Sequence, residues 1–146
     1  MAQPSNEEIV RRYIGALATH DGDTLGSGRN ADWTMEFPQS GERIRGHAND
    51  RAIIDHWPDG RPTGEGFQVF GSEDRWVVTP FNTVQRIVGS GDFWWADGTA
   101  RYPDGSSWFL AVQLQLKGGK VHRERWFFAP PFDAPAWRAA WVERMT

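Results

Sequence analysis

Residues 120–131 decide how the fold is interpreted, and they read Lys-Val-His-Arg-Glu-Arg-Trp-Phe-Phe-Ala-Pro-Pro. They follow a Gly-Gly turn at positions 118–119 and an apolar run over residues 108–116. Two extended runs joined by such a turn predict the last hairpin of a β-sheet. Side chains alternate between the two faces of a strand, so one face of this strand carries His122, Glu124, Trp126 and Phe128.

This face has two interpretations, and the sequence leaves both open. An imidazole and a carboxylate beside two aromatic rings can form the reactive corner of a binding pocket. In that pocket Glu124 is the leading candidate for a general acid or base, because burial raises the proton affinity of a carboxylate. Alternatively, the charges form a patch at a sheet edge or dimer surface, or Glu124 forms a buried ion pair with Arg12 or Arg125.

The composition favours one domain over residues 1–146. Aromatic residues make up 14% and include nine Trp, more than a compact core needs, so we expect some rings to line a cavity or an interface. A net charge of −3 argues against general nucleic-acid affinity. Because the chain has no Cys, disulfides, thiolate nucleophiles and Cys-ligated zinc are excluded.

The sequence contains no targeting, metal or cofactor signal. No apolar run approaches the roughly 18 residues of a membrane span, and the N-terminal residues lack the regions of a signal peptide. We therefore expect a cytoplasmic protein with no membrane association. His20, His47 and His56 lack paired ligand spacing, and the Gly-Ser-Gly at 89–91 does not open a helix as a phosphate loop must. We predict no metal and no cofactor.

The order of elements predicts an α+β fold. Ser5 and Glu8 have the spacing of a capping box that starts a first helix over residues 5–20, and Tyr13 lies within its apolar stripe. The other expected helices cover residues 22–29, residues 47–57 and a short segment capped by Asp133. The expected strands cover residues 33–37, 43–45, 81–88, 93–102, 108–116 and 121–128.

Several of these pieces resemble the nuclear transport factor 2-like superfamily, in its SnoaL-like (polyketide cyclase-like) branch, which is related to steroid Δ-isomerases. The matching pieces are residues 9–17 in the first helix, residues 33–38 followed by 41–46, and the final strand pair around residues 118–121. The resemblance implies a bent, mostly antiparallel sheet and helices around a cone-shaped pocket, commonly in a homodimer through the sheet.

The resemblance does not carry over a complete catalytic set. In the isomerases a Tyr of the first helix donates to the developing oxyanion, and Tyr13 matches it. The isomerase base corresponds to Phe37 and the second oxyanion donor falls near Val112, so steroid isomerisation by that mechanism is rejected. The Asp-Arg-Asp set of limonene epoxide hydrolase-like members is not found at matching strand positions. For a scytalone dehydratase-like set only His122 and Tyr13 are candidates.

Three hypotheses follow for function. The first is a cofactor-independent cyclase, isomerase or dehydratase that acts on an apolar carbonyl compound, in which Glu124 moves a proton, His122 orients or relays it and Tyr13 stabilises the oxygen. The second is a ligand-binding or accessory module without turnover, and the third is a purely structural dimer domain. Under the first two, the side chains expected to bind the ligand are Trp33, Met35, Phe37, Ile53, Trp57, Trp126 and Phe128.

Three surface features complete the predictions. Glu36 points away from Phe37, so we expect it on the surface or in a dimer contact, and residues 50–51 on a solvated helix face. The outer face of the long strands mixes polar and apolar side chains, which favours a homodimer interface. The segment 60–80 is rich in Gly and Pro but carries apolar residues, and we expect it to pack over the cone mouth or across the dimer.

Overall fold

The computed structural model describes residues 2–58, 68–70, 76–78 and 82–145, and for 68–70, 76–78 and 82–86 it describes the backbone alone. The helices are α1 (Asn6–Thr19), α2 (Gly22–Gly28) and α3 (His47–Asp55), and a 3-10 helix, η1, covers Ala136–Trp141. The strands are β1 (Arg29–Phe37), β2 (Glu42–Arg45), β3 (Gln68–Phe70), β4 (Trp76–Val78), β5 (Asn82–Ser90), β6 (Phe93–Arg101), β7 (Ser107–Lys117) and β8 (Lys120–Ala129).

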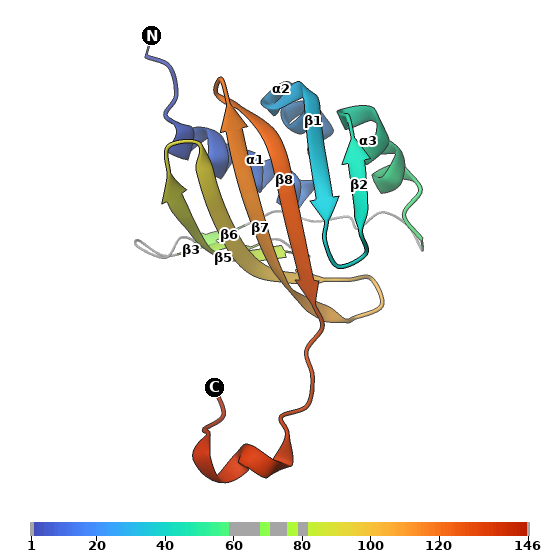
Figure 1. The fold of residues 1–146 in the computed structure, drawn as a ribbon, viewed down its shortest axis with the longest axis vertical. Helices are drawn as coiled ribbons and strands as arrows, with labels where there is room; N and C mark the ends of the chain where they lie inside the picture. The colour runs from blue at the N-terminus through green and yellow to red at the C-terminus, as the bar shows by residue number, and fades with distance from the viewer. Residues whose placement is uncertain (1, 59–67, 71–75, 79–81, 146) are drawn as a thin grey trace.

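Within the described residues the strands form one sheet in the order β2-β1-β8-β7-β6-β5-β4-β3. Neighbouring strands are antiparallel except β1 and β8, which are parallel. The helices α1, α2 and α3 lie on one side of the curved sheet (Figure 1). The α+β cone expected from the sequence is confirmed.

Local sequence signals explain where α1 begins and which face it buries. The Ser5 hydroxyl accepts from the Glu8 amide, and the Glu8 carboxylate accepts from the Ser5 amide at 2.7 Å, so the capping box is present. Tyr13 and Ile14 lie in its apolar stripe and are buried in the core. The helix ends at His20, whose φ of 54° is left-handed.

The predicted final hairpin is β7–β8. Gly118 and Gly119 both have positive φ, at 60° and 73°, as a two-residue type I′ turn requires. The hairpin is confirmed, but β8 is not an edge strand, because it lies between β7 and β1. The alternative in which its charges lie at a sheet edge is therefore wrong.

A bulge at His122 changes which side chains of β8 point inward. Val121 pairs with Leu116 and Arg123 with Gln115, so His122 is one extra residue on β8. Val121 and Glu124 are both fully buried. His122 is partly exposed, and its Nδ1 lies 3.3 Å from the carboxylate of Asp32. The expectation that His122 shares a face with Glu124 is wrong, because an extra residue reverses the alternation.

Other expected boundaries differ in detail. Strand β1 begins at Arg29 rather than at Trp33, and α3 ends at Asp55 rather than near Trp57. The expected terminal helix is η1, which follows Pro135 without a side-chain cap. The covering role expected for residues 60–80 lies outside the described residues, apart from the backbone of β3 and β4.

Candidate functional site

A cavity of about 530 Å³ is lined by residues of the three α-helices and of strands β1, β2, β6, β7 and β8. One part of its wall is an aromatic group on β1 and β8. Phe37 and Phe128 have ring centroids 5.8 Å apart, and Trp126 stacks on Phe128 at 5.9 Å with an interplanar angle of 16°. These rings present flat apolar surfaces to whatever occupies the cavity.

A second aromatic group lines the same cavity. Trp57 follows α3, Tyr102 follows β6, and Trp108 lies near the start of β7. The Tyr102 ring lies 6.3 Å from Trp57 in a stacked arrangement and 6.0 Å from Trp108 edge to face. With both groups in the wall, the cavity fits a flat, largely apolar molecule.

The seven side chains predicted to bind ligand fall in two places. Trp33 is buried and is not among the described lining residues. Its ring lies beneath Arg29, whose Cζ is 3.8 Å from the ring centroid. The structure brings the other six together in the cavity wall: Met35, Phe37, Ile53, Trp57, Trp126 and Phe128.

A buried polar cluster centred on Arg29 lies beside the cavity. The Nη1 of Arg29 donates to Oδ2 of Asp50 at 2.7 Å and contacts Nδ1 of His47 at 2.8 Å. Its Nε donates to the Tyr13 hydroxyl at 2.6 Å, and its Nη2 lies 3.9 Å from Oε1 of Glu124. Because Arg29 and Glu124 are buried and Asp50 is nearly so, two carboxylates share one guanidinium away from bulk water.

Burial sets the protonation of this cluster. It raises the pKa of Glu124, although Arg29 and the Trp126 indole act in the opposite direction. Burial and the neighbouring Glu124 carboxylate raise the pKa of Tyr13 well above its ordinary value. Burial and Arg29 lower the pKa of His47. Near neutral pH the cluster therefore holds a charged Arg29 with a neutral tyrosine and a neutral imidazole that accepts from Arg29.

Asp50 and Glu124 differ in their access to the cavity. Among the described residues of this cluster, Asp50 alone lines the cavity. Trp126 covers Glu124, because its Nε1 donates to Glu124 Oε2 at 2.9 Å while the residue itself lines the cavity. Asp50 lies in the first turn of α3, where the helix dipole favours a carboxylate.

The sequence-based reasoning missed Asp50 and Arg29. Asp50 was expected on a solvated helix face, which is wrong, because it is buried and bonded to Arg29. Its position four residues before the buried Ile54 on α3 was a signal for the inner face. Arg29 had no comparable signal, since it follows a Gly-rich segment and belongs to the part of β1 that was not predicted.

The described part of the chain contains neither a metal-binding cluster nor a membrane-spanning helix. Its His, Asp and Glu side chains form no group of three that could hold a metal ion. None of its helices is both long and apolar enough to cross a membrane.

Comparisons with known proteins place this fold. No protein-family model matches the sequence, and no curated protein sequence matches it. The structure is similar to that of an NTF2-like protein of unknown function from Burkholderia xenovorans LB400. The two are 30% identical, with a TM-score of 0.70 over 97% of this chain and 95% of the other.

Two further solved structures share the fold. A candidate ketosteroid isomerase from Kribbella flavida is 21% identical, with a TM-score of 0.72 over 97% of this chain and 90% of the other. A candidate SnoaL-like polyketide cyclase from Shewanella denitrificans is 16% identical, with a TM-score of 0.63 over 86% and 91% of the two chains. The relative from Burkholderia xenovorans spans nearly the whole chain, and the chain therefore belongs to the nuclear transport factor 2-like superfamily.

Proposed function

We propose that this protein binds a flat, largely apolar carbonyl compound in its cavity and moves a proton on it without a cofactor. The observation that carries the proposal is one carboxylate, Asp50, fixed by a buried Arg29 in the wall of an aromatic cavity of about 530 Å³. That volume is in the range of small-molecule sites. Isomerisation, cyclisation and dehydration of carbonyl compounds can each begin with such a transfer.

Asp50 acts as the base in this proposal. Its carboxylate takes the proton from a carbon next to the carbonyl group. The electron pair of that C–H bond forms a carbon–carbon double bond, and the π pair of the carbonyl group moves onto the oxygen, which gives an enolate. Returning the proton to another carbon completes an isomerisation. Arg29 bonds Oδ2 of Asp50, so we assign Oδ1 to the substrate. General acid–base catalysis of this kind is typically worth about 10²–10⁴-fold in rate.

Glu124 and Tyr13 act through Arg29 rather than on the substrate. Tyr13 accepts from the Nε of Arg29, and Glu124 lies beside its Nη2, so both orient the guanidinium that holds Asp50. The alternative expected from the sequence, in which Glu124 itself moves the proton, requires Trp126 to move aside. His122 lies beside Asp32 at the bulge and has no role in this proposal.

The cluster also offers a comparison with limonene epoxide hydrolase-like members, which need an Asp-Arg-Asp set around a water. Asp50, Arg29 and Glu124 form a carboxylate–guanidinium–carboxylate set from α3, β1 and β8. Because Trp126 covers Glu124, only one of these two carboxylates, Asp50, lines the cavity where a substrate would bind. That favours single-base proton transfer over hydrolysis that needs both acids.

Ligand binding without turnover is the second candidate. The mostly apolar and aromatic wall favours it, because such a wall binds flat molecules whether or not Asp50 reacts.

We also propose that the protein is a homodimer through the outer face of its sheet. Trp95, Phe127 and Gln113 lie on that face, and interfaces are enriched in such aromatic side chains.

The function can be tested with 2-tetralone, a flat bicyclic ketone with exchangeable protons beside its carbonyl. We expect the wild-type protein to bind it and to accelerate exchange of those protons for deuterium, measured by NMR. Asp50→Asn keeps the shape and a hydrogen-bond acceptor for Arg29 but should lose at least about 100-fold of the acceleration. Asp55→Asn, which changes an exposed carboxylate of the same helix, is the control and should retain it.

Binding without acceleration would overturn the enzyme and support the binding module. Absence of binding would overturn both candidates.

A further inference from the structure

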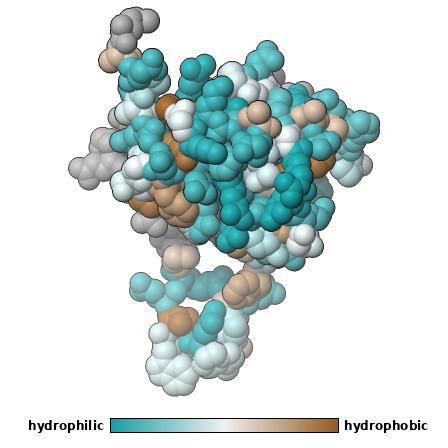
Figure 2. All heavy atoms as spheres, turned by 45° about the horizontal axis from the view of Figure 1, so that its top comes forward, coloured by the Kyte–Doolittle hydropathy of each residue, from teal (hydrophilic) through white to brown (hydrophobic). Residues whose placement is uncertain are grey.

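The C-terminal arm, residues 130–145, leaves the end of β8 and extends away from the sheet (Figure 1). In the space-filling view it is a separate lobe joined to the body by a narrow connection (Figure 2). Its three large aromatic side chains are exposed: Phe132 by 81%, Trp137 by 76% and Trp141 by 79%. Apolar surface gathered in this way on a soluble domain marks an interaction site.

The sequence of the arm keeps it away from its own body. Pro130 and Pro131 follow β8 directly, and a pair of prolines favours a stiff, extended backbone. Pro135 then precedes η1, which carries Trp137 and Trp141. Because a stiff spacer holds these indoles away from their own sheet, a second molecule is better placed than the same chain to cover them.

The outer face of the sheet carries a second exposed apolar surface, which we call the aromatic strip. It consists of Phe93 and Trp95 on β6, Phe109 on β7 and Phe127 on β8. Phe93 and Phe109 are 56% and 55% exposed, and the rings of Trp95 and Phe127 stack at 6.5 Å. The inner face of the same strands is buried in the core, so the strip is left for another partner.

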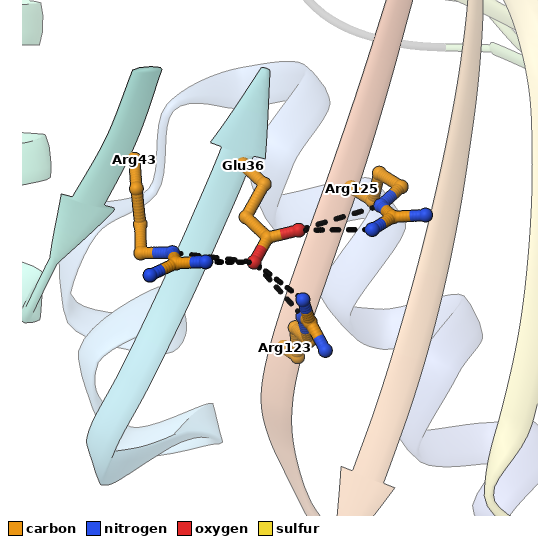
Figure 3. A network of polar contacts seen from close by, with 4 residues as sticks. All are labelled: Glu36, Arg43, Arg123 and Arg125. Atoms are coloured by element: carbon orange, nitrogen blue, oxygen red, sulfur yellow. Dashed lines mark hydrogen bonds and ion pairs between the residues drawn. The ribbon is translucent and has the colours of Figure 1, made fainter. Parts of the chain in front are cut away.

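Beside the strip lies a charged cluster that limits what can cover this face. Glu36 accepts from Arg43, Arg123 and Arg125 (Figure 3), and the three arginine side chains are 44–47% exposed. Their hydrogen bonds lower the pKa of Glu36 against the effect of burial, so the cluster carries two net positive charges. Two such clusters pressed directly together would repel each other, so a second copy is better placed over the aromatic strip than over this cluster.

We propose that the arm of one copy lies across the aromatic strip of a second copy, and that the second copy returns the same contact. Aromatic side chains bury about 150–250 Å² each, so three rings exposed to this extent offer roughly 500 Å² per arm. Each arm covers a similar area on the other copy, and the dimer has two arms, so the total surface buried in the contact is about 2,000 Å². Stable interfaces bury about 1,200–2,000 Å², and a reciprocal exchange gives the closed two-fold symmetry of most dimers.

This inference rests on the homodimer proposed above and adds the element that covers the strip. Trp137 and Trp141 are the anchors, since large aromatic side chains dominate interface energetics. Changing both to alanine leaves the body of the chain intact, because they are exposed in the single copy.

The first test is the mass of the full chain by light scattering over a dilution series. We expect the wild-type protein to have twice the mass of its 16.6 kDa chain. Trp137→Ala combined with Trp141→Ala should raise the dimer dissociation constant at least about tenfold, and Phe109→Ala should raise it too. Glu143→Ala changes an exposed arm residue outside the aromatic set and is the matched control.

The second test uses the absence of cysteine in the chain. One batch carries Ala140→Cys in the arm and another carries Gln113→Cys, which pairs with Trp95 and Arg125 across the strands. After the two batches are mixed, a bismaleimide linker should join one chain of each kind. The product cannot arise within one chain, so it reports an arm of one copy that lies beside the strip of another.

The outcomes separate the two proposals. A wild-type mass of 16.6 kDa at micromolar concentration would overturn both the homodimer and the arm exchange. A dimer that survives the tryptophan changes at wild-type affinity, without a mixed crosslink, would overturn the arm exchange and leave a dimer through the sheet. If the mixed crosslink does not form although the arm is protected from solvent, the arm folds back on its own chain. That result would overturn the arm exchange.

Discussion

Replacing Arg29 with methionine tests the buried cluster without any knowledge of the substrate. Arg29→Met keeps an unbranched apolar side chain over the Trp33 ring but removes the cation that Asp50 and Glu124 share. It also removes the donor to the Tyr13 hydroxyl. The change therefore leaves two buried carboxylates without a counter-charge.

The expected loss can be sized from this arrangement. Removing one partner of a buried ion pair costs about 3–5 kcal/mol, because the other charge stays buried. Glu124 takes up part of this cost by protonation, since its pKa is already raised by burial, so we expect a loss of about 3–4 kcal/mol in the free energy of unfolding. For a domain of this size such a loss lowers Tm by about 10 °C.

Urea denaturation and thermal melting at neutral pH measure the effect. The control is Arg11→Met, which removes an exposed pair with Glu7 one turn away on α1 and should cost about 0.3–0.5 kcal/mol. Adding Glu124→Gln to Arg29→Met should restore part of the stability, because it removes one of the uncompensated carboxylates. If Arg29→Met costs no more than Arg11→Met, the cluster does not hold the site together and the reasoning fails.

Three further changes follow from the same structure. Because burial raises the pKa of Glu124, its contribution to the free energy of unfolding is full below the unfolded-state pKa and is lost as the pH rises through the folded-state pKa. Urea denaturation between about pH 4 and pH 8 should show that Glu124→Gln removes this dependence, and parallel wild-type and variant curves would contradict it. Glu36 has a lowered pKa, so its contribution is present above the unfolded-state pKa and is lost as the pH falls through the folded-state pKa. Glu36→Gln should cost about 1 kcal/mol near neutral pH and progressively less in acid and in high salt, and a salt-independent deficit would count against the ion pairs of Figure 3. Trp57→Ala removes one ring of the second aromatic group and should weaken 2-tetralone binding about three- to tenfold by calorimetry, whereas Trp137→Ala in the arm should not.

Local patterns were enough to predict most of the elements. The capping box of Ser5 and Glu8, the Gly118-Gly119 turn and the alternation of the long strands act within a few residues of themselves, and each is present in the structure. The superfamily resemblance supplied the arrangement of these elements, because the parallel pairing of β1 with β8 joins segments far apart in the chain.

The site was harder to predict because small local changes decide it. One extra residue at His122 moves that side chain off the face of Glu124, since the side-chain period of a strand is two. The pattern of α3 alone predicts a solvated Asp50, because the partner that holds it in the interior, Arg29, lies on another element. Six of the predicted binding side chains line the cavity, but Trp33 supports Arg29 instead, and strand parity alone does not separate a cavity wall from the core behind it.

In the proposed reaction Asp50, and not Glu124, meets the substrate. The rate of deuterium exchange into 2-tetralone, compared between Asp50→Asn and Glu124→Gln at saturating ketone, distinguishes the two carboxylates. We predict that Asp50→Asn loses at least about 100-fold of the acceleration, while Glu124→Gln retains most of it. The reverse order, with Glu124→Gln inactive and Asp50→Asn active, would contradict the claim and assign the proton transfer to Glu124.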